Sequence, residues 1–197
     1  MNIKAELEKV MDVSKVMQLN TFEIEPLAVK AIMINEVVPS DPLQDFYGQP
    51  DADYVKTIIP LFQKAGCKVS TIQDILQMGV YITNAVKTPK SQYVIEKSSI
   101  ENSLPYLEKE IALFPNVKVI MLMGDVAKKA YNLISKKATK KNAIPAVSTY
   151  KSRNNEFYYG SIRIMPSYCI TGKNILIEKS KFEMAAEDIA IMLDIIT

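Results

Sequence analysis

A carboxamide and a carboxylate stand where two apolar runs end. Asn84 closes the segment VYITN, and Glu36 follows the segment LAVKAIMIN. An amide held in one orientation offers one acceptor and two donors. Asn84 can therefore accept from N3–H of uracil and donate to O4. Cytosine would instead place an acceptor opposite the amide oxygen and a donor opposite the amide nitrogen. Glu36 can orient a water or stabilise a cationic sugar while a bond breaks. Asn84 is thus a candidate for reading a base, and Glu36 is a candidate acid for bond-breaking chemistry.

Each of these residues also has a plainer interpretation. An asparagine after a strand often bonds to its own backbone in a turn, and a loop glutamate is often simply solvated. Asp41 and Asp45 lie in the same loop as Glu36 and can share or replace its role.

Aromatic and basic residues near the same ends predict contacts to a ligand. Phe46 and Tyr47 can stack on a planar base, a contact worth about 1 to 3 kcal/mol per base in nucleic-acid binding, or they can plug the edge of the core. Lys87 and Lys173 can contact phosphates, as can three further basic residues, Lys90, Lys151 and Arg153. Clustering of these five around the strand ends favours a polynucleotide, and scattering favours a free nucleoside or another small substrate.

Composition excludes several classes of site. The chain has no histidine, so acid–base chemistry falls to other groups or to water. The two cysteines, Cys67 and Cys169, show no CxxC or CxxH pattern, so neither a metal site nor a disulfide is predicted. No GxGxxG or GxxxxGK[ST] loop is present, and we expect no cofactor. The net charge of +2 is small, although SKKATKK, residues 135–141, has four lysines in seven residues. This run is either a solvated helix end or a nucleic-acid contact.

No apolar run approaches the roughly 20 residues that cross a bilayer, and the N-terminus lacks a signal-peptide pattern. These observations predict a cytoplasmic protein without a membrane contact. We also expect a monomer.

The elements that must position these residues alternate along the chain. Runs 27–35 and 117–124 are apolar on nearly every residue, as in strands covered on both faces, and 80–83 is a shorter strand. RIMPSYCITG, residues 163–172, ends a fourth alternating run. Helices are predicted over 51–66, 70–79 and 97–114, after Asp125, and from Ser180 onward. The pattern predicts an open α/β sheet with helices on both faces, in which ligands bind outside the carboxyl ends of the strands.

Helix starts are predicted from capping signals. Ser70 with Gln73 and Ser98 with Glu101 have capping-box spacing, and Asp125 is placed to cap the helix that follows 117–124.

Four segments in order resemble the uracil-DNA glycosylase superfamily, particularly the branch that includes the iron–sulfur enzymes. They are YITNAVKT, SLPYLEKEI, VIMLMGDVAKKAYNLI and the triplet Met165–Pro166–Ser167 in place of a His-Pro-Ser motif. The resemblance spans residues 27–193. It implies one domain over 1–197, with 1–26 as an N-terminal helical extension. It also implies a three-layer α/β/α sandwich around a mainly parallel four-stranded sheet.

The resemblance also implies roles. A flipped-out base would bind at the strand ends, with Asn84 as the uracil reader and Glu36 as the water-activating or cation-stabilising acid. Ser167 would touch the DNA backbone, and Met165 would stand where the family has a base-contacting histidine.

Departures from the family pattern alter these expectations. The first motif is NEVVPSDP, with Asn35 for the leading glycine and its proline one place late. GQPD puts Asp51 where a stacking phenylalanine stands, so Phe46, Tyr47 or Tyr54 would have to substitute. A cluster cysteine is replaced by Ser103 and the paired cysteines are missing, so no iron–sulfur cluster is predicted.

Met165 has no proton to donate to the leaving base, a loss that typically costs about 100- to 1000-fold in rate.

The resemblance and the missing donor leave two functions open. The first is a glycosylase that hydrolyses the N-glycosidic bond of uracil or a related damaged base in DNA, as in base excision repair. The second is a catalytically impaired module of the same fold that binds a nucleobase, nucleotide or nucleic acid. DNA or a nucleobase-bearing ligand is the predicted partner.

Overall fold

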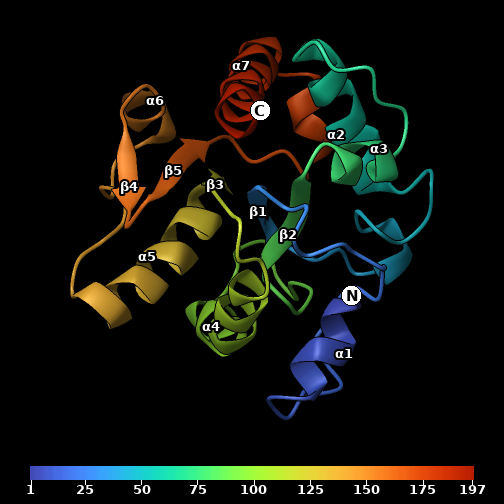
Figure 1. Cartoon of the computed structure of the whole chain (residues 1–197), viewed down its shortest axis with the longest axis vertical. Coiled ribbons are helices and arrows are strands. Elements are labelled where there is room, and N and C mark those ends of the chain that lie inside the picture. Colours follow the sequence, from blue (N-terminus) through green and yellow to red (C-terminus); the bar gives the residue numbers. More distant parts are fainter.

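The computed structural model describes residues 1–197 and contains one five-stranded sheet with the order β2-β1-β3-β5-β4 (Figure 1). The strands are β1 (Ala31–Val37), β2 (Val80–Val86), β3 (Val119–Met123), β4 (Phe157–Tyr159) and β5 (Ile162–Ser167). The neighbours among β2, β1, β3 and β5 pair in parallel, and β4 pairs antiparallel with β5.

The prediction of an α/β sandwich with a mainly parallel sheet is confirmed, and the four expected strands form its parallel part. The fifth strand, β4, was not predicted because it has only three residues, none of them fully buried. The central strands β1 and β3 are buried along almost their whole length, which is why their sequences are apolar on nearly every residue.

Helices cover both faces of the sheet and bury two separate hydrophobic clusters (Figure 1). One face packs against α1 (Ile3–Glu8), α4 (Lys97–Ala112) and α5 (Asp125–Thr139). The other packs against α2 (Asp53–Lys64) and α7 (Lys179–Ile196). Short helices α3 (Ile72–Gln77) and α6 (Thr149–Ser152) and the 3-10 turns η1 (Pro42–Gln44) and η2 (Lys173–Leu176) complete the chain. None of the helices combines the length and the apolar character needed to cross a membrane.

Three predicted helix starts are wrong in detail. The capping box of α3 uses Thr71 and Asp74 rather than Ser70 and Gln73. Helix α4 begins after Glu96 without a side-chain cap, so the predicted box at its start does not form. Gly124 is the N-cap of α5, and the predicted cap, Asp125, is the first helical residue.

The N-terminal segment is helical only over α1. Its apolar residues Ile3, Leu7 and Ile24 are fully or almost fully buried in the cluster beneath α4 and α5. Residues 1–26 therefore contribute to the core.

The strand order reverses between β1 and β3. From β1 the chain passes to β2 on one side, whereas β3 connects onward to β5 on the other side. Loops that leave neighbouring parallel strands in opposite directions open a crevice at their carboxyl ends, the usual ligand position in such sheets. The residues at this point are Glu36 in β1 and Gly124 after β3.

Candidate functional site

A cavity of about 450 Å³ opens at the carboxyl ends of β1 and β3. A space of this size lies within the range of pockets that hold small organic ligands. Its wall comes from β1, from the start of α5 and from the segments around α6 and η2, and it includes Glu36, Gly124, Ser148, Tyr168 and Cys169. The cavity therefore occupies the topological switch point of the sheet.

Glu36 is held in a defined position on this wall. Its side chain is half-buried, and its Oε1 accepts a hydrogen bond of 3.2 Å from the backbone N–H of Val126 in the first turn of α5. The N-terminus of a helix carries a partial positive charge that favours an anion. A carboxylate fixed in this way at a cavity wall is suited to stabilise a developing positive charge or to orient a water.

Gly124 gives Glu36 the space that it occupies. Gly124 has a φ of +103°, and a Cβ at this position would lie only 2.4 Å from Oε1 of Glu36. A side chain here would both strain the backbone and displace the carboxylate.

Cys169 lies beside Glu36 but does not provide a thiolate. Its pKa is raised, first by burial and then by the neighbouring Glu36. The thiol therefore stays protonated at neutral pH, and nucleophilic attack by this sulfur is not favoured.

Two tyrosine rings line the cavity that sequence reasoning did not assign to a site. Tyr168 follows β5 directly and its hydroxyl donates to Sδ of Met184, whereas Tyr150 in α6 is 73% exposed. The rule that ligands bind at the carboxyl ends of strands (the strand-end rule) could have found Tyr168, because this tyrosine directly follows a predicted strand. Both rings are available for a planar ligand.

Asn84 lies in a different and much smaller cavity, of about 10 Å³, enough for one water. Its Nδ2 donates to both carboxylate oxygens of Asp45, at 3.0 and 3.2 Å. These bonds fix the orientation of the amide and leave the buried Oδ1 without a partner. Burial is the main cause that raises the pKa of Asp45. The structure thus pairs Asn84 with Asp45, in place of the turn bond to its own backbone.

Phe46 and Tyr47 pack as parts of the core. The Phe46 ring is buried and lies 5.2 Å from the Tyr54 ring, centroid to centroid. Tyr47 stacks on Tyr81 at 5.9 Å, and its hydroxyl accepts from the N–H of Ile82. Both rings line the small cavity beside Asn84, but neither presents a free face there in this structure.

Lys87 is buried in an ion pair and does not reach a DNA backbone in this structure. Its ammonium bonds to Glu110 of α4 and donates to Oγ1 of Thr83 at 2.8 Å, and the side chain is 3% exposed. Glu110 also accepts from the hydroxyls of Thr83, at 2.8 Å, and Tyr81, at 2.5 Å. Sequence reasoning missed Glu110 because it comes from an otherwise amphipathic helix far along the chain.

Met165 and Ser167 of β5 both face the interior. Met165 is 4% exposed within the cluster beneath α2 and α7, and it lines neither cavity. Ser167 is fully buried, and its hydroxyl donates to Asp188 at 2.6 Å. Asp188 also pairs with Arg153. These contacts keep Ser167 from a DNA backbone in this conformation.

The remaining predicted residues lie on the surface. Asp41 is exposed, and its side chain caps η1 through the N–H of Leu43. It does not line the cavity of Glu36. Lys173 is exposed at the start of η2, between Gly172 and Asn174 of the cavity wall. Of the five basic residues proposed for phosphates, Lys87 and Arg153 are held in ion pairs with buried carboxylates, whereas Lys90, Lys151 and Lys173 are exposed. No group of three potential metal ligands is present.

The fold and the site at the switch point define an α/β sandwich with a strand-end cavity. A family model for the uracil DNA glycosylase superfamily matches residues 44–177, which is more than half of the chain. The protein therefore belongs to the uracil-DNA glycosylase superfamily. The matched part includes Asn84 and Met165 and begins after Glu36. Among curated proteins no match was found.

Proposed function

We propose that this protein hydrolyses the N-glycosidic bond of uracil or a related damaged base in DNA. One observation carries the proposal. Glu36, at the end of the central strand, is fixed against the start of α5 on the wall of a 450 Å³ cavity at the switch point. Membership of the superfamily supports the same class of reaction.

Glu36 would act on the sugar and on the attacking water. In a dissociative reaction the bond between C1′ and the base nitrogen breaks first, and the bonding electrons leave with the base. The carboxylate stabilises the resulting oxocarbenium ion and orients a water toward C1′. Water supplies the hydroxyl to C1′, and its proton neutralises the departing base.

Met165 makes this chemistry slow. A thioether offers no proton to the negative charge that builds on the leaving base, and the side chain is buried in the core. The absence of one such donor costs about 100- to 1000-fold in rate, so a low turnover is expected for uracil.

Asn84 would recognise the base through its free Oδ1. Because Asp45 holds the amino group, Oδ1 is the atom left to accept from N3–H of uracil. A base needs far more than the 10 Å³ of the present cavity. Binding at Asn84 therefore requires Asp45 and the rings beside it to move apart.

The second candidate is a binding module without chemistry. The small cavity at Asn84 and the buried Met165 favour it, because neither the recognition side chain nor the position of the leaving-group donor is open to substrate. In this alternative a nucleobase or nucleotide occupies the cavity of Glu36, where Tyr150 and Tyr168 offer rings.

Single-turnover release of uracil from labelled single-stranded and duplex DNA tests the proposal. Protein in excess is compared with the variants Glu36→Gln and Asn84→Ala. Glu101→Gln serves as the control, because Glu101 is an exposed carboxylate on α4. We expect slow release by wild type and by the control, at least a 100-fold loss in Glu36→Gln, and weakened selectivity for uracil over cytosine in Asn84→Ala.

Each outcome decides between the candidates. Release that Glu36→Gln leaves unchanged excludes Glu36 as the acid. No release by folded wild-type protein, together with saturable binding of a nucleotide, supports the binding module.

A further inference from the structure

The positive charge of this protein is concentrated in one segment. Residues 126–155 contain seven lysines and one arginine and no acidic residue. The rest of the chain carries 16 basic and 22 acidic residues, so the segment is strongly positive on a net acidic background. Such asymmetry within one chain is typical of a surface that binds a polyanion.

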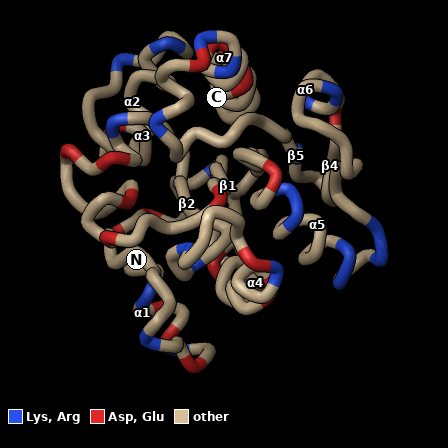
Figure 2. The backbone as a smooth tube through the Cα atoms, turned by 180° about the vertical axis from the view of Figure 1, so that it is seen from behind, with Lys and Arg blue, Asp and Glu red and all other residues tan.

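This charge lies along α5 and the chain that follows it (Figure 2). Five lysines on this stretch are exposed and have no ion pair: Lys129, Lys136, Lys140, Lys141 and Lys151. A spacing of seven residues places Lys129 and Lys136 on one side of α5, about 10 Å apart along its axis. Lys140, the C-cap residue, follows about 6 Å further along the axis. Lys137, by contrast, projects toward α4 and pairs with Glu108.

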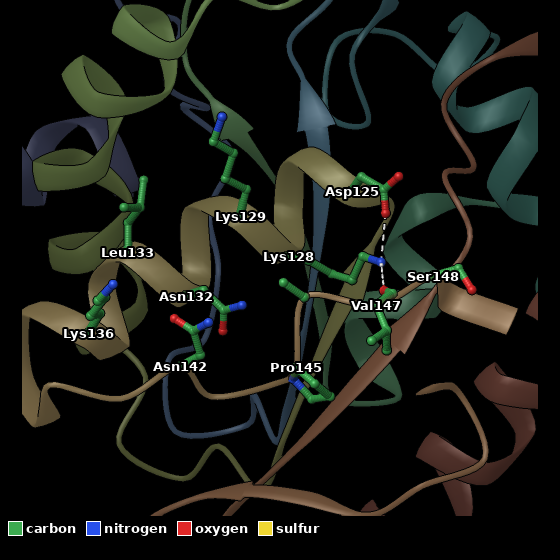
Figure 3. Close-up of a pocket in the computed structure, with 11 residues that line it drawn as sticks. Asp125, Lys128, Lys129, Asn132, Leu133, Lys136, Asn142, Pro145, Val147 and Ser148 are labelled. Carbon is green, nitrogen blue, oxygen red and sulfur yellow. Dashed lines mark hydrogen bonds and ion pairs between the residues drawn. The ribbon is translucent and has the colours of Figure 1, made fainter. Parts of the chain in front are cut away.

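A cavity of about 520 Å³ runs beside this lysine stripe (Figure 3). Its walls are α5 and the loop 142–148, and Lys129 and Lys136 both contribute to them. Lys128 spans the end of the cavity, where it pairs with Asp125 at 2.6 Å and donates to the carbonyl oxygen of Val147 (Figure 3). Lys128 thus holds the loop against the helix, and the ammonium groups of Lys129 and Lys136 remain free for a ligand.

The lysine-lined cavity adjoins the cavity of Glu36. Asp125 and Ser148 line both, one at the start of α5 and the other just before α6. A single chain of phosphates lying along the stripe would therefore lead directly to Glu36. The exposed Lys151, beyond this junction, extends the positive charge to the far side.

We propose that the stripe of Lys129, Lys136 and Lys140, with the cavity beside it, binds the phosphate backbone of a nucleic-acid strand whose reactive nucleotide lies at Glu36. This inference rests on the proposed function and assigns it a strand path. The stripe is about 16 Å long by helix geometry. One strand carries a charge about every 3.4 Å of helix axis, so the stripe covers about five nucleotides.

Fluorescence anisotropy with a labelled 15-residue oligothymidylate tests this assignment without any cleavage. The triple variant Lys129→Gln/Lys136→Gln/Lys140→Gln is compared with wild type and with Lys15→Gln/Lys68→Gln/Lys118→Gln. The control removes three exposed lysines that also have no ion pair and lie elsewhere, so both variants lose the same net charge.

We expect the stripe variant to bind at least tenfold more weakly at 50 mM salt and the control to bind nearly as wild type. Each phosphate contact to a single strand contributes about 0.7 to the slope of log K against log salt, so the slope should fall in magnitude by about 2. Equal losses in both variants, or no loss in the stripe variant, overturn the assignment.

Two further measurements separate the causes of failure. Tighter binding of polyglutamate or of phosphatidylserine vesicles than of the oligonucleotide would assign the surface to another partner and refute the strand path. Oligothymidylate contains no uracil, so its binding is measured independently of any cleavage. A protein that binds oligothymidylate through the stripe but releases no uracil from uracil-containing DNA would refute the proposed hydrolase activity and leave the strand path intact.

Discussion

The buried pair of Lys87 and Glu110 gives the sharpest test of how this core is held together. Lys87 is 3% exposed and Glu110 is 2% exposed, and Glu110 accepts from three side chains. Replacement of Glu110 by leucine leaves the ammonium of Lys87 buried, with Thr83 as its remaining partner. A charge isolated in this way costs about 3 to 5 kcal/mol.

The loss is large relative to the whole stability of the domain. Domains unfold with a free energy of about 5 to 15 kcal/mol. For a domain of this size each kcal/mol shifts the melting temperature by about 2 to 4 °C, so Glu110→Leu should lower it by about 10 °C. Urea unfolding followed by circular dichroism measures the free energy directly.

A double variant separates the cost of isolated charge from the loss of packing. Lys87→Met/Glu110→Leu removes both charges and keeps the volume nearly constant, so it should recover at least half of the loss. The hydroxyl of Tyr81 still accepts from Asn20 at 2.6 Å after this change. A single variant within about 1 kcal/mol of wild type, or a double variant no more stable than the single one, would refute the reasoning.

Three further changes have defined outcomes. Burial raises the pKa of Asp45 above its ordinary 3.8, so the folded state binds the proton more tightly and stability should fall as pH rises through that range. Asp45→Asn should flatten this fall between pH 4 and 8 and be the more stable at pH 8; parallel pH profiles in urea unfolding would contradict it. Thr71→Ala removes the capping box of α3 and should cost about 1 kcal/mol, whereas a neutral effect on the urea midpoint would mean that the cap adds nothing. Gly124→Ala forces a side chain into a φ of +103° and against Glu36; it should lower the melting temperature and reduce uracil release more than Glu101→Gln does, and wild-type values for both would show that the carboxylate position does not matter.

The strands were the most predictable part of the fold. Runs of apolar residues such as 119–123 have few alternatives, because a strand buried on both faces is apolar at nearly every position. The helix starts were less predictable, since Ser70 and Thr71 are both good N-caps and lie one residue apart. Asp74 decides between them by accepting from the backbone of both, a choice that depends on geometry.

The site was only partly predictable, for a physical reason. The strand-end rule located Glu36 and Asn84 correctly at the carboxyl edge of the sheet. Strand direction alone does not tell which side chains remain open there. Asn84 is closed off by Asp45, and Lys87 is drawn into the core by Glu110, a residue 23 positions away in the chain. Hydrogen-bond and ion-pair partners of this kind come from packing between distant elements, and no local sequence pattern predicts them.

The basic segment illustrates the opposite case. The four lysines of 135–141 were visible in the sequence. Their relation to the Glu36 cavity depends on the loop 142–148 folding back along α5, where Asn132 bonds to both backbone groups of Ile144. Of these lysines, Lys136 lines a cavity only because the loop 142–148 packs back along α5.

The packing of Tyr47 has a consequence for how the molecule behaves at high concentration. Strand β2 stands at the border of the sheet, where unpaired backbone groups invite a strand from another molecule. The Tyr47 hydroxyl accepts a hydrogen bond from the N–H of Ile82, and the N–H of Gln18 donates to the carbonyl oxygen of Lys87. Two loop segments thus satisfy backbone groups of this edge that could otherwise pair with another molecule. Loosening of the loop that carries Tyr47 would uncover a strand that is otherwise buried along its whole length and promote aggregation between copies of the protein.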